Sequence, residues 1–254
     1  MKLRVLGCSG GIGAGLRTTS MLIDQDILID AGTGVGDLSL EELKNIDHVF
    51  LTHAHLDHIV SIPFMLDSVA EMRTAPLNVY ATDATIDALQ QNIFNWKIWP
   101  DFSKIPDPEK PCLRYQSISV GEKIRLNGLV VTVLPAEHVV PAVGYQLDSG
   151  DSSIVYTGDT GTQEIFWECV NKIENLKYLV IETAFPNDQL ELAKVSKHLC
   201  PSLLAKELLK LRIKPEIYIT HLKPGASELT MQQIIESVQN FAPKMLTIGQ
   251  VIEF

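Results

Sequence analysis

The amino-acid sequence contains few cysteines, no long apolar run and no cluster of basic residues. Its four cysteines show no paired spacing: Cys8, Cys112, Cys169 and Cys200. We therefore expect free thiols in a reducing compartment rather than a disulfide framework. No apolar run is long enough to span a bilayer, and the apolar stretch within residues 1–8 is too short for a secretion signal. The absence of a long apolar run and of a secretion signal argues against a membrane protein, and we expect a cytoplasmic location.

Basic residues are outnumbered by acidic ones, with 21 Lys and Arg against 31 Asp and Glu, which gives a net charge of −10. A protein whose main partner is a long polyanion normally carries a basic patch or stripe. The sequence shows no such cluster. The charge balance therefore favours a small-molecule substrate over a long nucleic acid.

Apolar runs with strand character recur along the 254 residues, with helical patterns between them. Strands are expected at residues 3–6, 20–23, 27–29, 48–51, 77–80, 123–126, 129–134, 143–147, 153–156, 178–181, 217–219 and 244–248. Helices are expected at residues 38–44, 59–73, 83–94, 163–173, 201–211 and 229–240. This alternation favours an α/β fold in which two mixed β-sheets pack face to face with helices outside, a four-layer αββα sandwich. No linker or solenoid repeat divides the chain, so residues 1–254 are expected to form a single domain, with a break near residues 121–128 between two similar halves.

A glycine-rich stretch at residues 7–15 follows the first expected strand, and its glycine spacing is similar to that of a dinucleotide-binding loop. That interpretation requires a helix directly after the glycines. Residues 18–30 instead indicate a hairpin that turns at residues 24–26. We therefore expect a flexible loop near the functional site, available to contact substrate.

Residues 95–117 interleave four aromatic side chains with prolines. The aromatic residues are Trp96, Trp99, Phe102 and Tyr115. Prolines interrupt regular structure, while aromatic rings need a surface that buries them. Two interpretations remain open: a packed surface crossover, or a lid or subunit contact beside the site, where a ring stacks on a base.

Four candidate metal ligands occupy six consecutive positions directly after the apolar residues 48–52: His53, His55, Asp57 and His58. Alternate side chains of an extended chain point to the same face, so His53 and His55 can converge on one ion. A helix that begins just after them would turn Asp57 and His58 towards a second ion. Imidazole and carboxylate ligands suit zinc, manganese or iron. The alternative is a solvated histidine-rich turn, as in tags and linkers, but the apolar flanks argue against it.

The pattern His-x-His-x-Asp-His at a strand end resembles the signature of the metallo-β-lactamase superfamily. That resemblance implies three later ligands in the order His, Asp, His, each just past a strand. The sequence supplies His138 after residues 129–134, Asp159 after residues 153–156 and His221 after residues 217–220. The resemblance therefore covers nearly the whole chain, and it implies the metallo-β-lactamase fold.

The resemblance also implies a centre of two divalent metal ions, expected to be Zn²⁺, with Mn²⁺ or Fe²⁺ as alternatives. On family grounds the first ion is expected on His53, His55 and His138, the second on Asp57, His58 and His221, with Asp159 bridging them. Asp57 is expected to orient the nucleophilic hydroxide as well. Carboxylates rather than cysteines at positions 57 and 159 are typical of the phosphodiesterase and nuclease branches, not of true β-lactamases.

A second pair of residues points to acid catalysis. Glu182 ends the expected strand at residues 178–181, and His198 lies just before the expected helix at residues 201–211. In the phosphodiesterase branch a Glu orients a His that protonates the leaving alkoxide, so the resemblance implies these roles for Glu182 and His198. A positioned general acid raises a rate by roughly 10²–10⁴-fold. The alternative is local: Glu182 caps or pairs nearby, and His198 only begins a helix.

Within that branch, four phrases look like those of class II cyclic-nucleotide phosphodiesterases. They are His-Leu-Asp-His-Ile, Ile-Glu-Thr-Ala-Phe-Pro-Asn, Lys-His-Leu-Cys-Pro-Ser-Leu-Leu-Ala and Ile-Thr-His-Leu-Lys-Pro. The resemblance implies hydrolysis of 3′,5′-cyclic AMP or GMP to the 5′-monophosphate, by a homodimer. The sequence departs from that family after His58, where residues 59–63 replace a more usual glycine-containing stretch.

The main alternative is a tRNA 3′-processing endonuclease, a related group that carries a basic RNA-gripping arm between the ligands corresponding to His138 and Asp159. Residues 139–158 are long enough only for one tight hairpin, so no arm fits. Other metal-dependent hydrolases also stay open: an aryl- or alkylsulfatase, or a phosphonate-pathway cyclic phosphodiesterase. A flavodiiron-like redox centre would need a Glu where His55 stands, and a scaffold without activity would lack ligands.

Overall fold

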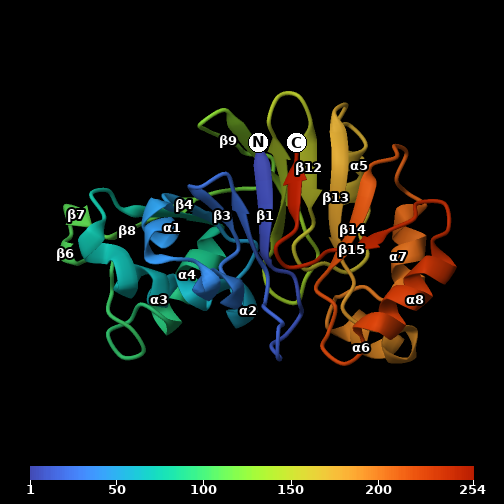
Figure 1. Ribbon diagram of the computed structural model, residues 1–254, viewed down its shortest axis with the longest axis horizontal. Helices are drawn as coiled ribbons and strands as arrows, with labels where there is room; N and C mark the ends of the chain where they lie inside the picture. Colours follow the sequence, from blue (N-terminus) through green and yellow to red (C-terminus); the bar gives the residue numbers. More distant parts are fainter. The chain divides into compact units, whose positions relative to one another are not determined.

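The computed structural model describes all residues 1–254 and divides into two compact units (Figure 1). The first unit comprises Met1–Gly7, Arg17–Ile118 and Ile248–Glu253, and the second comprises Cys8–Leu16, Ser119–Thr247 and Phe254. Each unit contains one seven-stranded mixed sheet. The expected α/β class with two mixed sheets is therefore confirmed. That residues 1–254 form a single domain stays a prediction.

The sheet of the first unit has the strand order β16-β1-β2-β3-β4-β5-β8. Its strands are β1 Lys2–Gly7, β2 Ser20–Ile23, β3 Ile27–Ile29, β4 His48–Phe50, β5 Leu77–Ala81, β8 Leu113–Ser117 and β16 Val251–Glu253. β16, β1, β2 and β3 pair antiparallel, whereas β3, β4, β5 and β8 pair parallel. Parallel strands end at the same edge of a sheet. Residues that follow β3 and β4 are therefore brought together at one edge.

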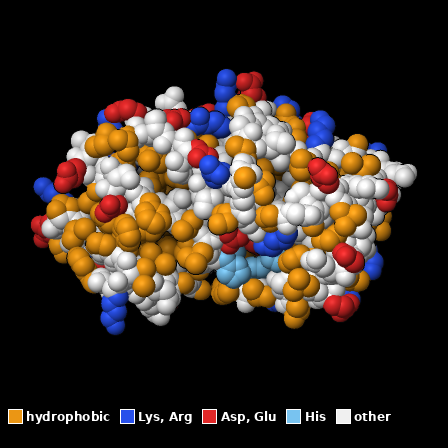
Figure 2. Space-filling view, turned by 60° about the horizontal axis from the view of Figure 1, so that its bottom comes forward, with side chains coloured by type: hydrophobic (Ala, Val, Ile, Leu, Met, Phe, Trp, Pro, Cys, Tyr) orange, Lys and Arg blue, Asp and Glu red, His pale blue; other side chains and the backbone are white.

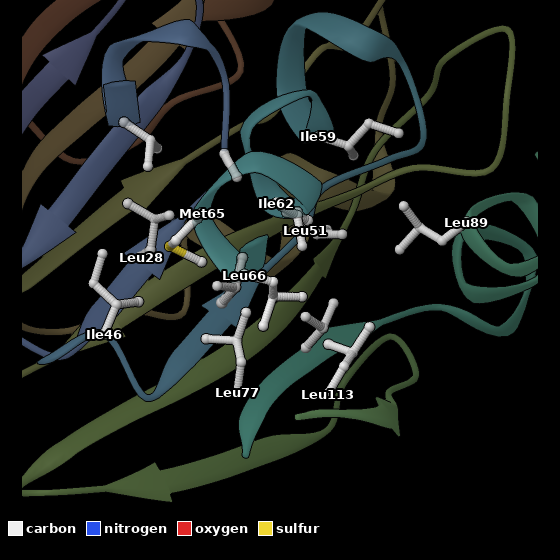
Figure 3. Close-up of a cluster of buried hydrophobic side chains, with 14 of the residues drawn as sticks. Leu28, Ile46, Leu51, Ile59, Ile62, Met65, Leu66, Leu77, Leu89 and Leu113 are labelled. Atoms are coloured by element: carbon white, nitrogen blue, oxygen red, sulfur yellow. The ribbon is translucent and has the colours of Figure 1, made fainter. Parts of the chain in front are cut away.

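Helices pack on this sheet and close the first core. They are η1 Thr33–Asp37, α1 Leu40–Asn45, α2 Leu56–Ile59, α3 Ser61–Val69, η2 Ala70–Met72 and α4 Asp83–Asn92, and a small ribbon is formed by β6 Pro106–Asp107 and β7 Lys110–Pro111. Ile62 and Leu66 of α3 join Leu28 of β3 and Leu77 of β5 in one buried cluster (Figure 3). The single helix expected over residues 59–73 is interrupted after α2, because Pro63 has no N–H to donate to a preceding turn.

The sheet of the second unit has the order β15-β14-β13-β12-β11-β10-β9. Its strands are β9 Lys123–Leu126, β10 Leu129–Pro135, β11 Val143–Asp148, β12 Ser153–Tyr156, β13 Leu176–Glu182, β14 Glu216–Thr220 and β15 Lys244–Met245. β9 to β12 form an antiparallel meander, and β12 to β15 pair parallel. β10 runs in the direction of β12, because both are antiparallel to β11. The carboxyl ends of β10, β12, β13 and β14 therefore lie at one edge.

The helices of the second unit are α5 Ile165–Val170, η3 Asn187–Gln189, α6 Leu190–Val195, α7 Pro201–Leu208 and α8 Ser227–Ser237. α7 and α8 lie next to each other beside β14 and β15 (Figure 1). Leu204 and Leu208 of α7 share a buried cluster with Ile219 of β14 and Ile234 of α8. Pro201 starts α7 at the position predicted from the sequence, where its missing N–H costs nothing.

Strand β8 lies within the aromatic and proline-rich segment 95–117, where the sequence predicted no regular element. Phe102 is buried in the first core, and Trp99 and Tyr115 pack against it, while Trp96 is exposed. The segment is therefore a packed crossover in the first unit. All four cysteines are free, as expected. None of the helices has both the length and the hydrophobicity that crossing a membrane requires.

Candidate metal centre

The histidine-rich motif lies where the loop after β4 meets α2. β4 ends at Phe50, so His53 and His55 belong to an extended loop rather than to the strand itself. α2 begins at Leu56 and carries Asp57 and His58 in its first turn. The helix therefore begins three residues before the expected start at residue 59, so that Asp57 and His58 are helical.

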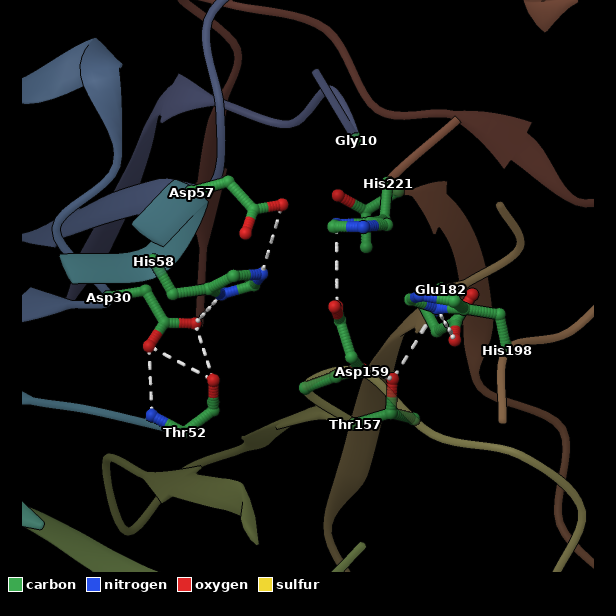
Figure 4. A network of polar contacts seen from close by, with 12 residues as sticks. Gly10, Asp30, Thr52, Asp57, His58, Thr157, Asp159, Glu182, His198 and His221 are labelled. Atoms are coloured by element: carbon green, nitrogen blue, oxygen red, sulfur yellow. Dashed lines mark hydrogen bonds and ion pairs between the residues drawn. The ribbon is translucent and has the colours of Figure 1, made fainter. Parts of the chain in front are cut away.

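The four side chains of this motif, which we call the first-unit cluster, gather closely: His53, His55, Asp57 and His58. The ring centroid of His53 lies 4.6 Å from that of His55 and 4.3 Å from that of His58. Nε2 of His58 lies 3.8 Å from a carboxylate oxygen of Asp57 (Figure 4). His53 and His58 are fully buried, whereas His55 and Asp57 are partly exposed. Buried imidazoles beside an accessible carboxylate form a site that solvent or a ligand can reach.

Asp30, a buried residue that directly follows β3, fixes the orientation of two rings of this cluster. Its carboxylate accepts a hydrogen bond from His58 Nδ1 at 2.8 Å. It also accepts from the amide of Thr52 at 2.8 Å and from the Thr52 hydroxyl at 2.9 Å. That hydroxyl lies 2.9 Å from His53 Nδ1. Because Nδ1 is engaged in both rings, Nε2 is the nitrogen suited to bind an ion.

Sequence reasoning missed Asp30, although a lone carboxylate at the end of the apolar strand β3 was a usable signal. Gly32, two residues later, was also missed. A Cβ at Gly32 would lie 2.4 Å from the carbonyl oxygen of Asp57 and 2.6 Å from that of Thr19. Only glycine therefore allows α2 to approach this loop so closely.

The second unit places three predicted site residues at the ends of neighbouring parallel strands. Asp159 follows β12, Glu182 is the last residue of β13, and His221 directly follows β14. The ligand atoms of Asp159, His198 and His221 all lie within 4.8 Å of one another. A carboxylate oxygen of Asp159 lies 3.3 Å from His221 Nδ1 (Figure 4). Together with His138, these residues form what we call the second-unit cluster.

His138 and His198 complete this cluster from two loops. Nδ1 of His138 donates to the backbone carbonyl of Lys197 at 3.1 Å, which directs Nε2 to the other side of the ring. The rings of His138 and His198 lie 4.9 Å apart between centroids. The ring of His198 stacks on that of His221 at 5.3 Å. All three imidazoles are buried.

Glu182 and His198 form the pair that the sequence predicted. His198 Nδ1 donates to the Glu182 carboxylate at 2.8 Å, and the amide of Thr160 donates to the same oxygen at 3.1 Å. Complete burial raises the pKa of Glu182, an effect that the charge of His198 partly offsets. Burial alone would lower the pKa of His198, but the charge and hydrogen bond of Glu182 outweigh it, so that the pKa is raised. The carboxylate therefore holds the ring and stabilises its protonated form.

The backbone at His221 is strained, with a φ of 64°. A residue other than glycine in this region costs on the order of 1–3 kcal/mol and is found most often at functional sites. The His221 amide donates to Cys8 at 2.8 Å, and a Cβ at Gly10 would lie 2.5 Å from the His221 carbonyl oxygen. The glycine-rich stretch is thus a loop packed against a site residue, with no helix after it, and the dinucleotide interpretation is excluded.

Both clusters fit a divalent metal ion by the chemistry of their donors. Imidazoles whose Nδ1 is held by a carboxylate, a hydroxyl or a carbonyl are typical of metal ligands, and the neighbouring carboxylates add oxygen donors. His53 and His58 are held by the Asp30–Thr52 network, and His138 is held by Lys197. Histidine side chains also reach the surface beside acidic and basic ones (Figure 2).

The chain was compared with protein-family models and with curated proteins. The family model of the beta-lactamase superfamily domain matches residues 25–242, so the chain belongs to the beta-lactamase superfamily. It is 28% identical over 210 residues to a probable 3′,5′-cyclic-nucleotide phosphodiesterase of Yersinia pestis, which covers 72% of this chain and 58% of that protein. It is 24% identical over 172 residues to a ribonuclease Z of Archaeoglobus fulgidus, and the alignment covers 65% of this chain and 53% of that protein. The aligned region spans little more than half of each relative.

Two solved structures have the same fold along the whole chain. The metallo-beta-lactamase fold protein YhfI from Bacillus subtilis superposes with a TM-score of 0.78 at 22% identity, covering 100% of this chain and 98% of that one. Unliganded yeast PDE1 superposes with a TM-score of 0.82 at 19% identity, and the superposition covers 100% of this chain and 99% of that one. The expected metallo-β-lactamase fold is confirmed. The two curated relatives are named as a phosphodiesterase and a ribonuclease, and the fold implies divalent metal ions.

Proposed function

We propose that this protein is a dinuclear-metal phosphodiesterase that hydrolyses a small phosphodiester, with 3′,5′-cyclic AMP or GMP, converted to the 5′-monophosphate, as the first candidate. The observation that carries the proposal is the Glu182–His198 hydrogen bond of 2.8 Å within the second-unit cluster. Cleavage at phosphorus expels a basic ribose oxygen, and a held imidazole beside metal-ligand side chains meets that need. The Yersinia relative, named for this activity, adds support.

The proposed metal ligands are the seven residues that the superfamily resemblance implies. His53, His55 and His138 would hold one ion, Asp57, His58 and His221 the other, and Asp159 would bridge the two. When bound, such ions supply Lewis-acid stabilisation and a hydroxide at neutral pH. Zn²⁺ suits this mixture of imidazole and carboxylate best, and Mn²⁺ or Fe²⁺ would also fit.

His198 supplies the proton in this proposal. Glu182 accepts from Nδ1, so the ring presents Nε2 to the substrate. As the bond between phosphorus and the 3′-oxygen breaks, its electron pair stays on that oxygen, which takes the proton from Nε2. Hydroxide adds to phosphorus and completes the 5′-monophosphate. Glu182 stabilises the imidazolium before transfer, and Asp57, partly exposed at the first-unit cluster, orients the nucleophile.

A ribonuclease Z-like activity on tRNA 3′ ends is the second candidate, because the chain also matches a ribonuclease Z. Two observations favour a small substrate. Residues 139–158 consist of a loop and the β11–β12 hairpin, which leaves no segment for an RNA-gripping arm. The net charge of −10 also opposes a long polyanion.

The proposal is tested by assaying the purified, metal-loaded protein against cyclic AMP, cyclic GMP, a chromogenic phosphodiester, a sulfate ester and pre-tRNA. We expect turnover of a cyclic nucleotide with the 5′-monophosphate as product. Turnover of pre-tRNA or of the sulfate ester alone would overturn the assignment. The expected homodimer, which rests on resemblance only, is checked by light scattering on the same sample.

A further inference from the structure

A second pocket lies in the first unit, at the edge of its sheet opposite to the histidine-rich motif. Its volume is about 350 Å³, and Arg73, Pro76, Lys110, Cys112 and Arg114 are among the residues that line it. Pro76 directly precedes β5, and Arg114 is the second residue of β8. β4, β5 and β8 are parallel, so the pocket lies at their amino ends, whereas the motif follows the carboxyl end of β4.

The charged side chains that line this pocket are all basic. Two arginines and a lysine line it, and no carboxylate does, in a chain whose net charge is −10. Lys110 and Arg114 are exposed, and neither forms an ion pair within the protein, although Asp107 lies opposite Lys110 in the β6–β7 ribbon. Two unpaired cations beside a concave surface favour an anionic ligand.

Arg73 provides an independent observation. Its side chain is only 5% exposed, and its terminal nitrogens donate to the carbonyls of Lys44 and Ile46 and to the Asp47 carboxylate. Its Nε, in contrast, has no acceptor in the protein. A buried N–H of a charged group that lacks an acceptor is costly, and native structures normally satisfy such groups. Nε is itself covered from solvent, so Arg73 offers the pocket a guanidinium fixed in place by its other bonds rather than a free N–H.

We propose that this pocket, which we call the Arg73 pocket, binds an anion of phosphate chemistry. Planar guanidinium groups match phosphate oxygens, and a lysine adds a compact charge. The volume lies in the range of small-ligand sites and accommodates inorganic phosphate or the phosphate end of a nucleoside monophosphate. This site is separate from both metal-ligand clusters and does not depend on the proposed phosphodiesterase activity.

Cys112 gives a local readout, because its partly exposed side chain lines the same pocket. The full-length protein is treated with iodoacetamide, an uncharged thiol reagent, over a series of inorganic phosphate concentrations. The alkylation rate of the Cys112 peptide is then measured by mass spectrometry. At ten times the dissociation constant, mass action leaves about one chain in eleven free, so the rate should fall about tenfold. Partly exposed Cys169, in the second unit, serves as the internal control and should react at an unchanged rate.

The pocket variant is the double substitution Lys110→Ala with Arg114→Ala. It should abolish protection of Cys112 while far-ultraviolet circular dichroism stays unchanged, because both side chains are exposed. The matched control is Lys123→Ala with Arg125→Ala, which removes the same charge from exposed positions on β9 and should retain full protection.

Two further arms decide the nature of the ligand. Sodium chloride at equal ionic strength should not protect Cys112 from alkylation. If sodium chloride protected Cys112 as well as phosphate does, the proposal would be overturned. Full protection of the Lys110→Ala, Arg114→Ala protein by phosphate would overturn it equally. AMP is compared with inorganic phosphate: protection by AMP at lower concentration identifies a nucleotide, and equal potency identifies the phosphate group alone.

Discussion

Asp30 and His58 are joined by a hydrogen bond of 2.8 Å, although 28 positions separate them in the chain. β3 and β4 are parallel neighbours, so the loops that follow them meet at one edge of the first sheet. Asp30 therefore hydrogen-bonds the imidazole of His58 directly. It also orients the imidazole of His53 through the hydroxyl of Thr52. The orientation of the proposed ligands thus depends on a residue outside the proposed ligand set.

Substituting Asp30→Asn should weaken metal binding about 10–100-fold, because such outer carboxylates fix the tautomer and raise the basicity of a ligating imidazole. The amide keeps the volume of the side chain but removes the charge that holds His58 Nδ1. Metal affinity is measured by competition with a chromophoric chelator. Asp37→Asn, which changes an exposed carboxylate paired with Arg17 in the same unit, is the control. If Asp30→Asn bound metal as tightly as the wild type, the Asp30 carboxylate would serve only to stabilise the fold.

Gly32→Ala should destabilise the protein by about 1–3 kcal/mol, because the new Cβ has no room. It would lie 2.4 Å from the Asp57 carbonyl oxygen, a backbone atom that moves only if α2 moves. Gly36→Ala is the matched control, since a Cβ there meets nothing within 4 Å. Urea unfolding compares the two variants. Similar stabilities for both would mean that the loop relaxes freely and that Gly32 does not set the position of α2.

Replacement of His198 by Ala should keep the fold and the bound metal while turnover of a cyclic nucleotide falls by roughly 10²-fold or more. The loss should shrink for a nitrophenyl ester, whose leaving group needs no proton. Glu182→Gln should show a milder form of the same pattern, because it weakens the hold on Nδ1 without removing the ring. His48, the only one of the seven histidines outside both clusters, supplies the control His48→Ala. Equal losses on both substrates would give His198 a structural or binding role.

Asp159→Ala should lose both metal ions more readily than His221→Ala does, because the proposed bridging ligand serves both ions. Elemental analysis after dialysis against a weak chelator measures the metal content of each variant. Before any substitution, the wild-type protein should hold, or take up on addition, two ions per chain. A His221→Ala protein that lost more metal than Asp159→Ala would refute the bridging assignment.

Acid should destabilise the first unit partly through Glu42. The capping hydrogen bonds with Ser39 and the guanidinium of Arg4 lower the pKa of Glu42 from 4.5 to about 2. The pKa of Glu42 is therefore lower in the folded state than in the unfolded state. Its contribution to the stability of the fold is complete above pH 4.5 and is lost as the pH falls towards 2. In urea unfolding, Glu42→Gln should be less stable than wild type near neutrality, and this difference should narrow through that range. Glu71→Gln, an exposed carboxylate in the same unit, should leave the pH dependence unchanged.

Much of this arrangement could be predicted from residue pattern. The motif at residues 53–58 and the later His138, Asp159 and His221 were identifiable because each follows an apolar strand, and strand ends at one sheet edge bring side chains together. The Glu182–His198 pair was predicted from the resemblance to the phosphodiesterase branch, because His198 precedes a helix and does not follow a strand. The predicted boundaries of some elements were wrong for local reasons: the helix expected over residues 59–73 is interrupted at Val60, before Pro63 in the first turn of α3.

Other features could not be predicted because they depend on contacts distant in sequence. Asp30 and Gly32 look ordinary until β3 lies beside β4 and α2 packs on their loop. β8 was hidden because it ends a segment rich in proline and aromatic residues, and it pairs as a strand with β5. The strain at His221 likewise results from its packing on the glycine-rich loop.

The antiparallel pairing of β1 with β16 has a consequence for biosynthesis. β1 precedes the long segment Ser119–Thr247 of the second unit in the chain, whereas its partner at Val251–Glu253 follows that segment. The sheet of the first unit therefore stays open along β1 until the ribosome has passed that segment and synthesised Val251–Glu253. An unpaired strand edge is a template for aggregation. The half of the protein that is synthesised first is thus the half completed last, and a nascent chain stalled after the second unit would depend on chaperones to cover that edge.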